Sequence, residues 1–133
     1  MIDITEEKYH CLLNEAYTQI KVNGIYFNSI TNAYIASRSM YNREKLQIAN
    51  MSTEEAIKYS KKMDTILNWD KMKYMILVEL LLRKFEHNKD QRDVLMSTGD
   101  EVLTTYRKND GNLGQALMEV RSLLRGEERW LQQ

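Results

Sequence analysis

The sequence has no proline, one cysteine and five glycines among its 133 residues. Proline and glycine interrupt helices more than other residues do, so their scarcity favours a mainly helical chain. The single Cys11 cannot form a disulfide within the chain, which fits a reducing compartment and predicts a cytoplasmic location. The first ten residues contain no apolar run, so no signal peptide is expected.

The sequence also has no excess of positive or of negative charge. Lys plus Arg and Asp plus Glu each number 19, which gives a formal net charge of +0. A balanced chain has no overall attraction to nucleic acid or to an anionic membrane, and neither is an expected partner, although a local basic pocket is compatible with this balance. Hydrophobic residues make up 43% of the chain, so we expect it to fold, and its length predicts a single domain over residues 1–133.

Local signatures of common catalytic and metal sites are missing. His10 and His87 lie far apart in the sequence, with no cysteine or carboxylate at ligand spacing, so no metal is predicted. Phosphate-binding glycine loops and nucleophile elbows are absent as well. Tyr34 and Tyr41 could face a pocket, but tyrosines on helices more often belong to the core or its rim. Taken alone, these residues predict a mainly helical domain and no particular chemistry.

The longest apolar stretch runs from residue 68 to residue 85 and reads NWDKMKYMILVELLLRKF. Its apolar side chains recur at helical steps and, over residues 76–82, widen to cover most of the circumference, which is typical of a helix buried inside a domain. Charged residues such as Glu79 and Arg83 exclude a membrane-spanning role. We therefore expect a central helix here, with Asn68 as its N-cap and other helices packed around it.

Other segments carry periodicities or turn signals of their own. Residues 3–20 have an amphipathic pattern that begins with a candidate capping box, which predicts an added N-terminal helix. Asn23-Gly24 between two apolar pairs predicts a β-hairpin, the one sheet that the pattern indicates. Further helices are predicted over 28–41, 43–49, 53–62, 90–97 and 113–125; residues 101–105 fit either a helical turn or a strand, and 126–133 are expected to form a loose tail.

Three blocks, taken in order, resemble the NADAR family, which is also called the YbiA-like family. YFNSITNAYIASRS at residues 26–39 is similar to the family's T-V-E-H-A-Y-Q-A-x-K segment, and residues 69–100 are similar to W-x-x-V-K, L-L-x-x-K-F and T-G-D. NLGQALMEVRSLL at residues 112–124 resembles N-x-L-G-x-x-L-M-x-V-R-x-x-L. The resemblance implies a compact, mainly α, YbiA-like domain with one small β-hairpin near the N-terminus.

The resemblance also implies a chemistry. Family members hydrolyse N-glycosidic bonds in phosphorylated riboflavin-pathway intermediates or in ADP-ribosylated guanine, and they need no metal or organic cofactor. This chain departs from the family pattern at the reacting end: Thr31 stands where the family has an acidic residue, and the family's D-x-x-W-G loop is shortened to residues 106–111. Arg38 replaces a lysine, and residues 3–20 replace a glycine- and phenylalanine-rich segment. Threonine cannot carry the charge with which a carboxylate stabilises a developing sugar cation.

These departures lead to three hypotheses. The first is a catalytically degenerate protein that binds an ADP-ribose-like nucleotide or phosphosugar, or a protein partner, without turnover. The second is an active N-glycosidase with a relocated acid, for which Asp110 is a weak candidate because a turn or cap role suits it better. The third is a protein-interaction module or homo-oligomer without a ligand. The expected ligand-binding residues are Thr31, Asn32, Tyr34, Arg38, Trp69 and Asn112, with Arg38 holding a phosphate and Tyr34 or Trp69 covering a base.

Overall fold

The computed structural model describes residues 1–107 and 111–131, with side chains up to residue 126. Helices dominate these residues, so the prediction of a mainly α fold with a small β element near the N-terminus is confirmed. Among the described residues, no helix combines the length and the apolar character needed to cross a bilayer. In chain order the elements are β1 (Ile2–Asp3), the 3-10 helix η1 (Glu7–Leu12), β2 (Ile20–Val22), β3 (Ile25–Phe27), α1 (Ile30–Ala36), α2 (Asn42–Ala49), α3 (Thr53–Ser60), α4 (Trp69–His87), α5 (Lys89–Ser97), β4 (Leu103–Thr104) and α6 (Leu113–Leu131).

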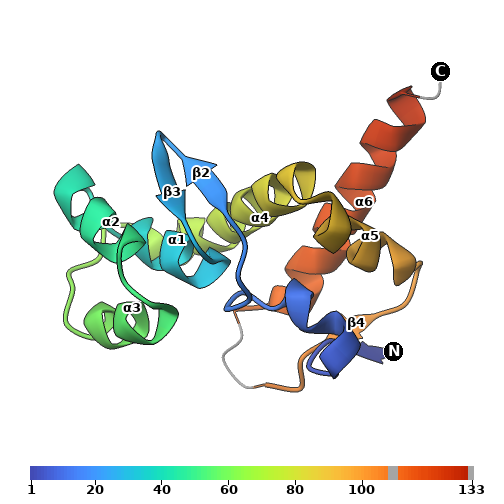
Figure 1. Cartoon of the computed structure of the whole chain (residues 1–133), viewed down its shortest axis with the longest axis horizontal. Coiled ribbons are helices and arrows are strands. Elements are labelled where there is room, and N and C mark those ends of the chain that lie inside the picture. The colour runs from blue at the N-terminus through green and yellow to red at the C-terminus, as the bar shows by residue number, and fades with distance from the viewer. Residues whose placement is uncertain (108–110, 132–133) are drawn as a thin grey trace.

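Helix α4 crosses the middle of the molecule, as predicted for the central helix. One side carries α1, α2, α3 and the β2–β3 hairpin, and the other carries η1, α5, β4 and α6 (Figure 1). Leu77, Leu81 and Phe85 are almost completely buried in the second half of α4. The first half differs from the prediction, because Met72 and Met75 are exposed rather than packed in the core. The apolar stripe is therefore covered where α1, α5, α6 and β2 meet the helix.

The β2–β3 hairpin forms as its turn sequence predicts. Asn23 and Gly24 have φ values of 50° and 84°, the left-handed pair that a type I′ turn requires. Ile20 pairs with Phe27 across the hairpin, and both side chains are buried. A second sheet was not indicated by the pattern: β1 pairs in parallel with β4, so residues 103–104 of the undecided segment form a strand.

The predicted helix over residues 3–20 is wrong. Residues 2–3 pair with β4, and only Glu7–Leu12 are helical, in a 3-10 turn. Asp3 does not close a capping box, because its carboxylate accepts hydrogen bonds from the backbone N–H and hydroxyl of Thr5. The apolar periodicity does mark core residues, since Leu12 and Leu13 are buried. These residues belong to a 3-10 turn and the loop after it, and not to one face of a long helix.

Several helix ends also differ from their predicted positions. Helix α1 ends at Ala36, earlier than expected, while the capping box of Ser52 and Glu55 starts α3 as predicted. Helix α6 continues to Leu131, so residues 126–131 of the predicted loose tail are helical. The predicted end of this helix falls at Gly126, yet the φ of Gly126 is not left-handed and the helix passes through it.

Two glycines of α6 give a matched test of the packing between α6 and β4. A Cβ added at Gly114 would lie 2.3 Å from the backbone oxygen of Leu103, whereas one at Gly126 would meet no atom within 4 Å. We expect Gly114→Ala to destabilise the protein by about 1–3 kcal/mol through overpacking. Gly126→Ala should instead stabilise it by up to about 1 kcal/mol through helix propensity. Urea unfolding of both variants measures this, and equal effects of the two substitutions would contradict the packing described.

Candidate functional site

Helix α1 places three of the expected site residues on one side. Thr31, Tyr34 and Arg38 follow one another at steps of three and four residues, the spacing at which helical side chains become neighbours. Arg38 lies just beyond the end of α1, whose C-cap is Ser37. The Tyr34 ring packs against the ring of Trp69, the first residue of α4, with centroids 5.1 Å apart and planes tilted by 58°. The structure thus brings Tyr34 and Trp69 together beside Thr31 and Arg38.

The Tyr34 phenol is held in its neutral form. Partial burial raises its pKa, and the nearby Arg38 guanidinium opposes that shift only in part. Tyr34 therefore offers an aromatic face and a neutral hydroxyl at ordinary pH, and it is poorly suited to act as a base. Trp69 is half-buried and lines an open hollow of about 550 Å³ formed by residues 65–71.

Arg38 fastens the segment that precedes α4. Its Nε and Nη2 donate to Thr65 Oγ1 at 2.9 and 2.8 Å, and Nη2 also donates to the Ser60 carbonyl at 3.1 Å. The Arg38 carbonyl accepts from the backbone N–H of Ile66 at 2.9 Å. Most of the guanidinium fork expected to hold a phosphate thus binds the protein itself, and only Nη1 makes no hydrogen bond to a described residue.

Asn32 has no capacity left for a ligand. Its Oδ1 accepts from the hydroxyls of Ser29 and Thr53, and its Nδ2 donates to the carbonyls of Ile48 and Met51. These four bonds use both lone pairs and both N–H groups of an amide that is completely buried. The side chain joins α1 to the ends of α2 and α3, so we leave it out of the proposed site.

Thr31 lies beside the loop that follows η1. Its backbone N–H donates to the Asn14 carbonyl at 3.0 Å, and its hydroxyl makes no hydrogen bond to a residue that the structure describes. The next residue in that loop, Glu15, pairs with Arg107 at 2.8 Å. Asn112 is exposed, has a φ of 63° and accepts the Ala116 N–H at the start of α6. Asp110 lies outside the described residues, so its predicted role stays untested.

Sequence reasoning missed the buried lysine behind this loop. Lys84 is 0% exposed, and its Nζ donates to the Leu13 carbonyl at 3.2 Å. Burial lowers its pKa to about 8, against a weaker opposing effect of Cys11 and Glu15. The available signal was a lysine inside the most apolar stretch of the chain, at the lysine position of the L-L-x-x-K-F motif.

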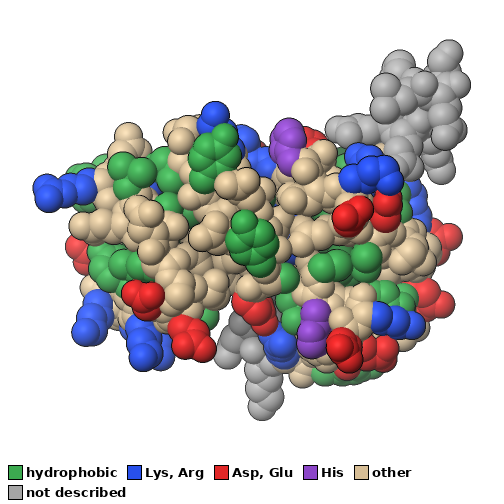
Figure 2. Space-filling view, viewed as in Figure 1, with side chains coloured by type: hydrophobic (Ala, Val, Ile, Leu, Met, Phe, Trp, Pro, Cys, Tyr) green, Lys and Arg blue, Asp and Glu red, His purple; other side chains and the backbone are tan. Residues whose placement is uncertain are grey.

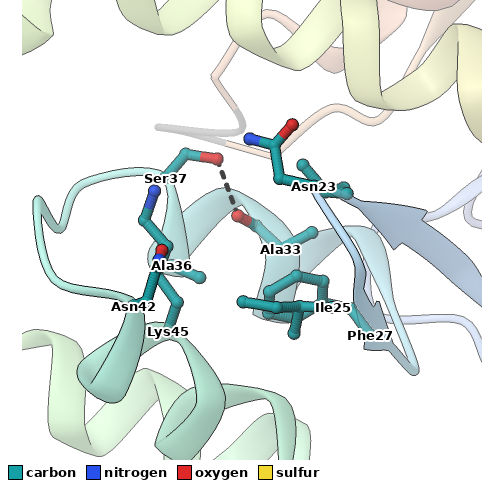
Figure 3. A pocket seen from close by; sticks show the side chains of 9 residues that line it. Asn23, Ile25, Phe27, Ala33, Ala36, Ser37, Asn42 and Lys45 are labelled. Carbon is teal, nitrogen blue, oxygen red and sulfur yellow. Dashed lines mark hydrogen bonds between the residues drawn. The ribbon is translucent and has the colours of Figure 1, made fainter.

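A separate small cavity lies under the β2–β3 hairpin. Its volume is about 30 Å³, and side chains from the hairpin, α1 and α2 face one another across it (Figure 3). The Ser37 hydroxyl at its edge donates to the Ala33 carbonyl at 2.8 Å. This volume suits a single water molecule and is far below that of a ligand pocket. No cluster of three or more metal-ligating side chains occurs within residues 1–107 and 111–126.

Comparison with known proteins identifies the family. The model of the NADAR domain family matches residues 4–112. The chain belongs to the NADAR family. The matched range begins at residue 4, so it includes most of the N-terminal segment that was expected to be an addition to the domain, and it ends where the third resembling block starts.

Two relatives of this NADAR chain are informative. A Nostoc punctiforme protein named N-glycosidase Npun_R5314 is 28% identical, over 90% of this chain and 88% of the relative. The solution structure of the Escherichia coli protein YbiA superposes with a TM-score of 0.82, at 22% identity, over 96% of this chain and 84% of YbiA. The second likeness shows that the NADAR chain shares the YbiA fold.

The Arg38–Thr65 contact can be tested by a double-mutant cycle. Arg38→Ala and Thr65→Val should each lower the free energy of unfolding by at least about 1 kcal/mol, because both remove the two Arg38–Thr65 hydrogen bonds, and Arg38→Ala also removes the bond to the Ser60 carbonyl. The double variant should lose less than the sum of the two single losses. Arg43→Ala is the control, since Arg43 is exposed and makes no hydrogen bond to a described residue. Additive losses in urea titrations would show that the pair is not coupled.

The buried Lys84 predicts a pH-dependent stability. The unfolded chain keeps this lysine protonated up to about pH 10.5, while the folded chain releases the proton near pH 8. Stability should therefore rise with pH above 8, by about 2 kcal/mol between pH 7 and 9.5 relative to Lys84→Met, in which this group is absent. Urea unfolding of both proteins at the two pH values measures the difference. A difference that does not change with pH would assign Lys84 an ordinary pKa.

Proposed function

We propose that this NADAR chain binds an ADP-ribose-like nucleotide or phosphosugar N-glycoside beside Thr31 without cleaving it efficiently. The observation that carries the proposal is the Tyr34–Trp69 ring pair beside a position that holds a threonine instead of an acid. The surrounding fold and the aromatic pair are kept, while the group expected to assist bond breaking is missing. A cytoplasmic site of action stays a prediction from the single cysteine.

The missing carboxylate matters because of the charge that builds up during cleavage. Breaking an N-glycosidic bond leaves positive charge on the sugar, which a carboxylate stabilises directly or through an activated water. The Thr31 hydroxyl is neutral and offers only a weak dipole. The phenol of Tyr34, whose pKa is raised, cannot replace that charge either.

The binding groups that remain suit a ligand with a base and a phosphate. Trp69 and Tyr34 present ring edges and faces on which a nucleobase can stack. Arg38 retains Nη1 for a phosphate oxygen, and Lys71 lines the hollow next to Trp69. On the face drawn in Figure 2, basic and acidic side chains occur together, and no broad area of one sign is visible (Figure 2). This surface suits a small ligand better than the backbone of a nucleic acid.

Hydrolysis is the second candidate function. Its support is the Nostoc punctiforme relative, whose name is that of an N-glycosidase and which aligns along most of both chains. Activity would need a carboxylate from a part of the chain other than α1.

Ligand binding and cleavage can be measured side by side. We expect ADP-ribose, NAD or a ribosylaminopyrimidine phosphate to raise the melting temperature of the unaltered chain. A ligand at 100 times its Kd adds about 2.7 kcal/mol of stability. Mass spectrometry of the same mixtures should show intact ligand. Trp69→Ala should remove the shift, whereas Tyr26→Ala, at an exposed tyrosine of β3, should keep it.

The outcomes separate the three hypotheses. A free base and free sugar released by the unaltered chain would contradict the proposal in favour of an N-glycosidase. Absence of any shift with all three ligands would leave the interaction module or homo-oligomer as the remaining hypothesis. Thr31→Glu tests the position of residue 31 directly. Cleavage by this variant of a ligand that the unaltered chain leaves intact would place residue 31 at the reacting end of the site.

A further inference from the structure

A hollow of about 450 Å³ lies where α4 ends and α5 begins. It is lined by residues 17–18, which precede β2, and by residues 87–91, which join the two helices. The Gln91 side chain ties these segments together, because its Nε2 donates to the Tyr17 carbonyl at 3.1 Å. Trp69 lies at the opposite end of α4, a helix of 19 residues. A helix of that length spans about 28 Å, so the hollow is separate from the nucleotide site proposed above.

The N-terminus of α5 forms part of this hollow and has no cap. Asn88, at the N-cap position, makes no side-chain capping bond; its amide is turned toward α4, where Nδ2 donates to the Lys84 carbonyl at 2.8 Å. The first N–H used within the helix is that of Arg92, and the N–H groups of residues 89–91 make no hydrogen bond to a described residue. Free N–H groups at the start of a helix carry partial positive charge and attract anions.

Two buried polar side chains of the lining also lack partners. Thr18 is 2% exposed, and its hydroxyl makes no hydrogen bond to a described residue. Gln91 Oε1 is likewise buried and unpaired. The hydroxyl can donate a hydrogen bond, whereas the amide oxygen can only accept one. Buried polar atoms without partners are rare in proteins and call for a water or a ligand, so the hollow needs an occupant that both accepts and donates.

We propose that this hollow binds a phosphate group that still carries a proton. The bare phosphate oxygens accept from the N–H groups of residues 89–91 and from the Thr18 hydroxyl. The phosphate O–H donates to Gln91 Oε1. One ion therefore satisfies the uncapped helix and both unpaired side chains. A cation would instead meet the positive end of the helix, and an apolar ligand would leave every one of these groups unpaired.

The acceptors in the lining decide which anion fits. Gln91 Oε1 and the exposed carboxylate of Asp90 repel an oxygen that has no hydrogen, and at neutral pH all four oxygens of sulfate are of that kind. Inorganic phosphate keeps at least one O–H at neutral pH, and a phosphomonoester keeps one below its second pKa of about 6. His87 and Lys89, whose Nζ also pairs with Asp93 at 2.9 Å, add donors for the remaining oxygens. The site should therefore select phosphate over sulfate.

Inorganic phosphate, ribose 5-phosphate and sulfate are the probes, added to the full-length chain at pH 6 and constant ionic strength. In NMR titrations, phosphate should shift the amide signals of residues 89–91 saturably and bind at least about tenfold more tightly than sulfate. Residues 53–55, at the capped start of α3, should not shift. Thr18→Val should weaken phosphate binding about tenfold and leave the melting temperature without phosphate nearly unchanged, because the lost hydroxyl has no partner. Ser97→Ala, at the other end of α5, is the matched control and should bind normally.

Each outcome decides for or against the phosphate site. Shifts with phosphate and ribose 5-phosphate together support a site for phosphomonoesters, and shifts with phosphate alone support a site for the free ion. Equal binding of sulfate would overturn the proposal, and so would unchanged phosphate affinity in Thr18→Val. Phosphate shifts confined to the surroundings of Trp69 and Arg38 would refute this site while supporting the nucleotide site. The comparison with sulfate uses the unaltered chain, so it stays decisive even if Thr18→Val does not fold.

Discussion

Burial of the second half of α4 is the constraint on which the rest of the structure depends. Leu77, Leu80, Leu81 and Phe85 occupy the centre of the core, and α1, α5 and α6 are held together mainly by covering them. Apolar burial of this kind has no direction, so it fixes which helices meet α4 but not their exact registers. Lys84 differs from these buried apolar side chains, because its contact has a direction. Its ammonium group needs a hydrogen-bond acceptor and so fixes the position of the Leu13 carbonyl.

Directional contacts supply the registers that apolar burial leaves open. The Asn32 amide joins α1 to the ends of α2 and α3, and Arg38 joins the end of α1 to the segment before α4. Both residues were expected to bind a ligand, and both hold the framework that presents Thr31, Tyr34 and Trp69. A family motif therefore contains residues that position a helix, and sequence alone does not separate these from the residues proposed to face a ligand.

Local signals predicted local structure well. Asn23-Gly24 gave the hairpin, Ser52 with Glu55 gave the start of α3, and the apolar run gave α4, because each signal acts within a few residues. The helix over residues 3–20 failed, since an apolar periodicity does not distinguish a long helix from a 3-10 turn and a loop that happen to face the same core. Two long-range contacts were hidden for a related reason: the Glu15–Arg107 and Lys84–Leu13 pairs join residues far apart in the chain, and only the folded arrangement brings them together.

The pairing of β1 with β4 has a consequence for how the chain reaches its folded state. Residues 2 and 103 become neighbours, so this sheet cannot form during synthesis until residue 104 has left the ribosome. Closing a loop of this size costs about 2 kcal/mol more than closing one of ten residues. Two short backbone hydrogen bonds offset little of that cost, and the burial of Ile4 and Leu103 must supply most of the remainder. Until then β1 is unpaired and Ile4 lacks the strand that helps to bury it, and this is the stage at which a chaperone or a neighbouring chain has access to it.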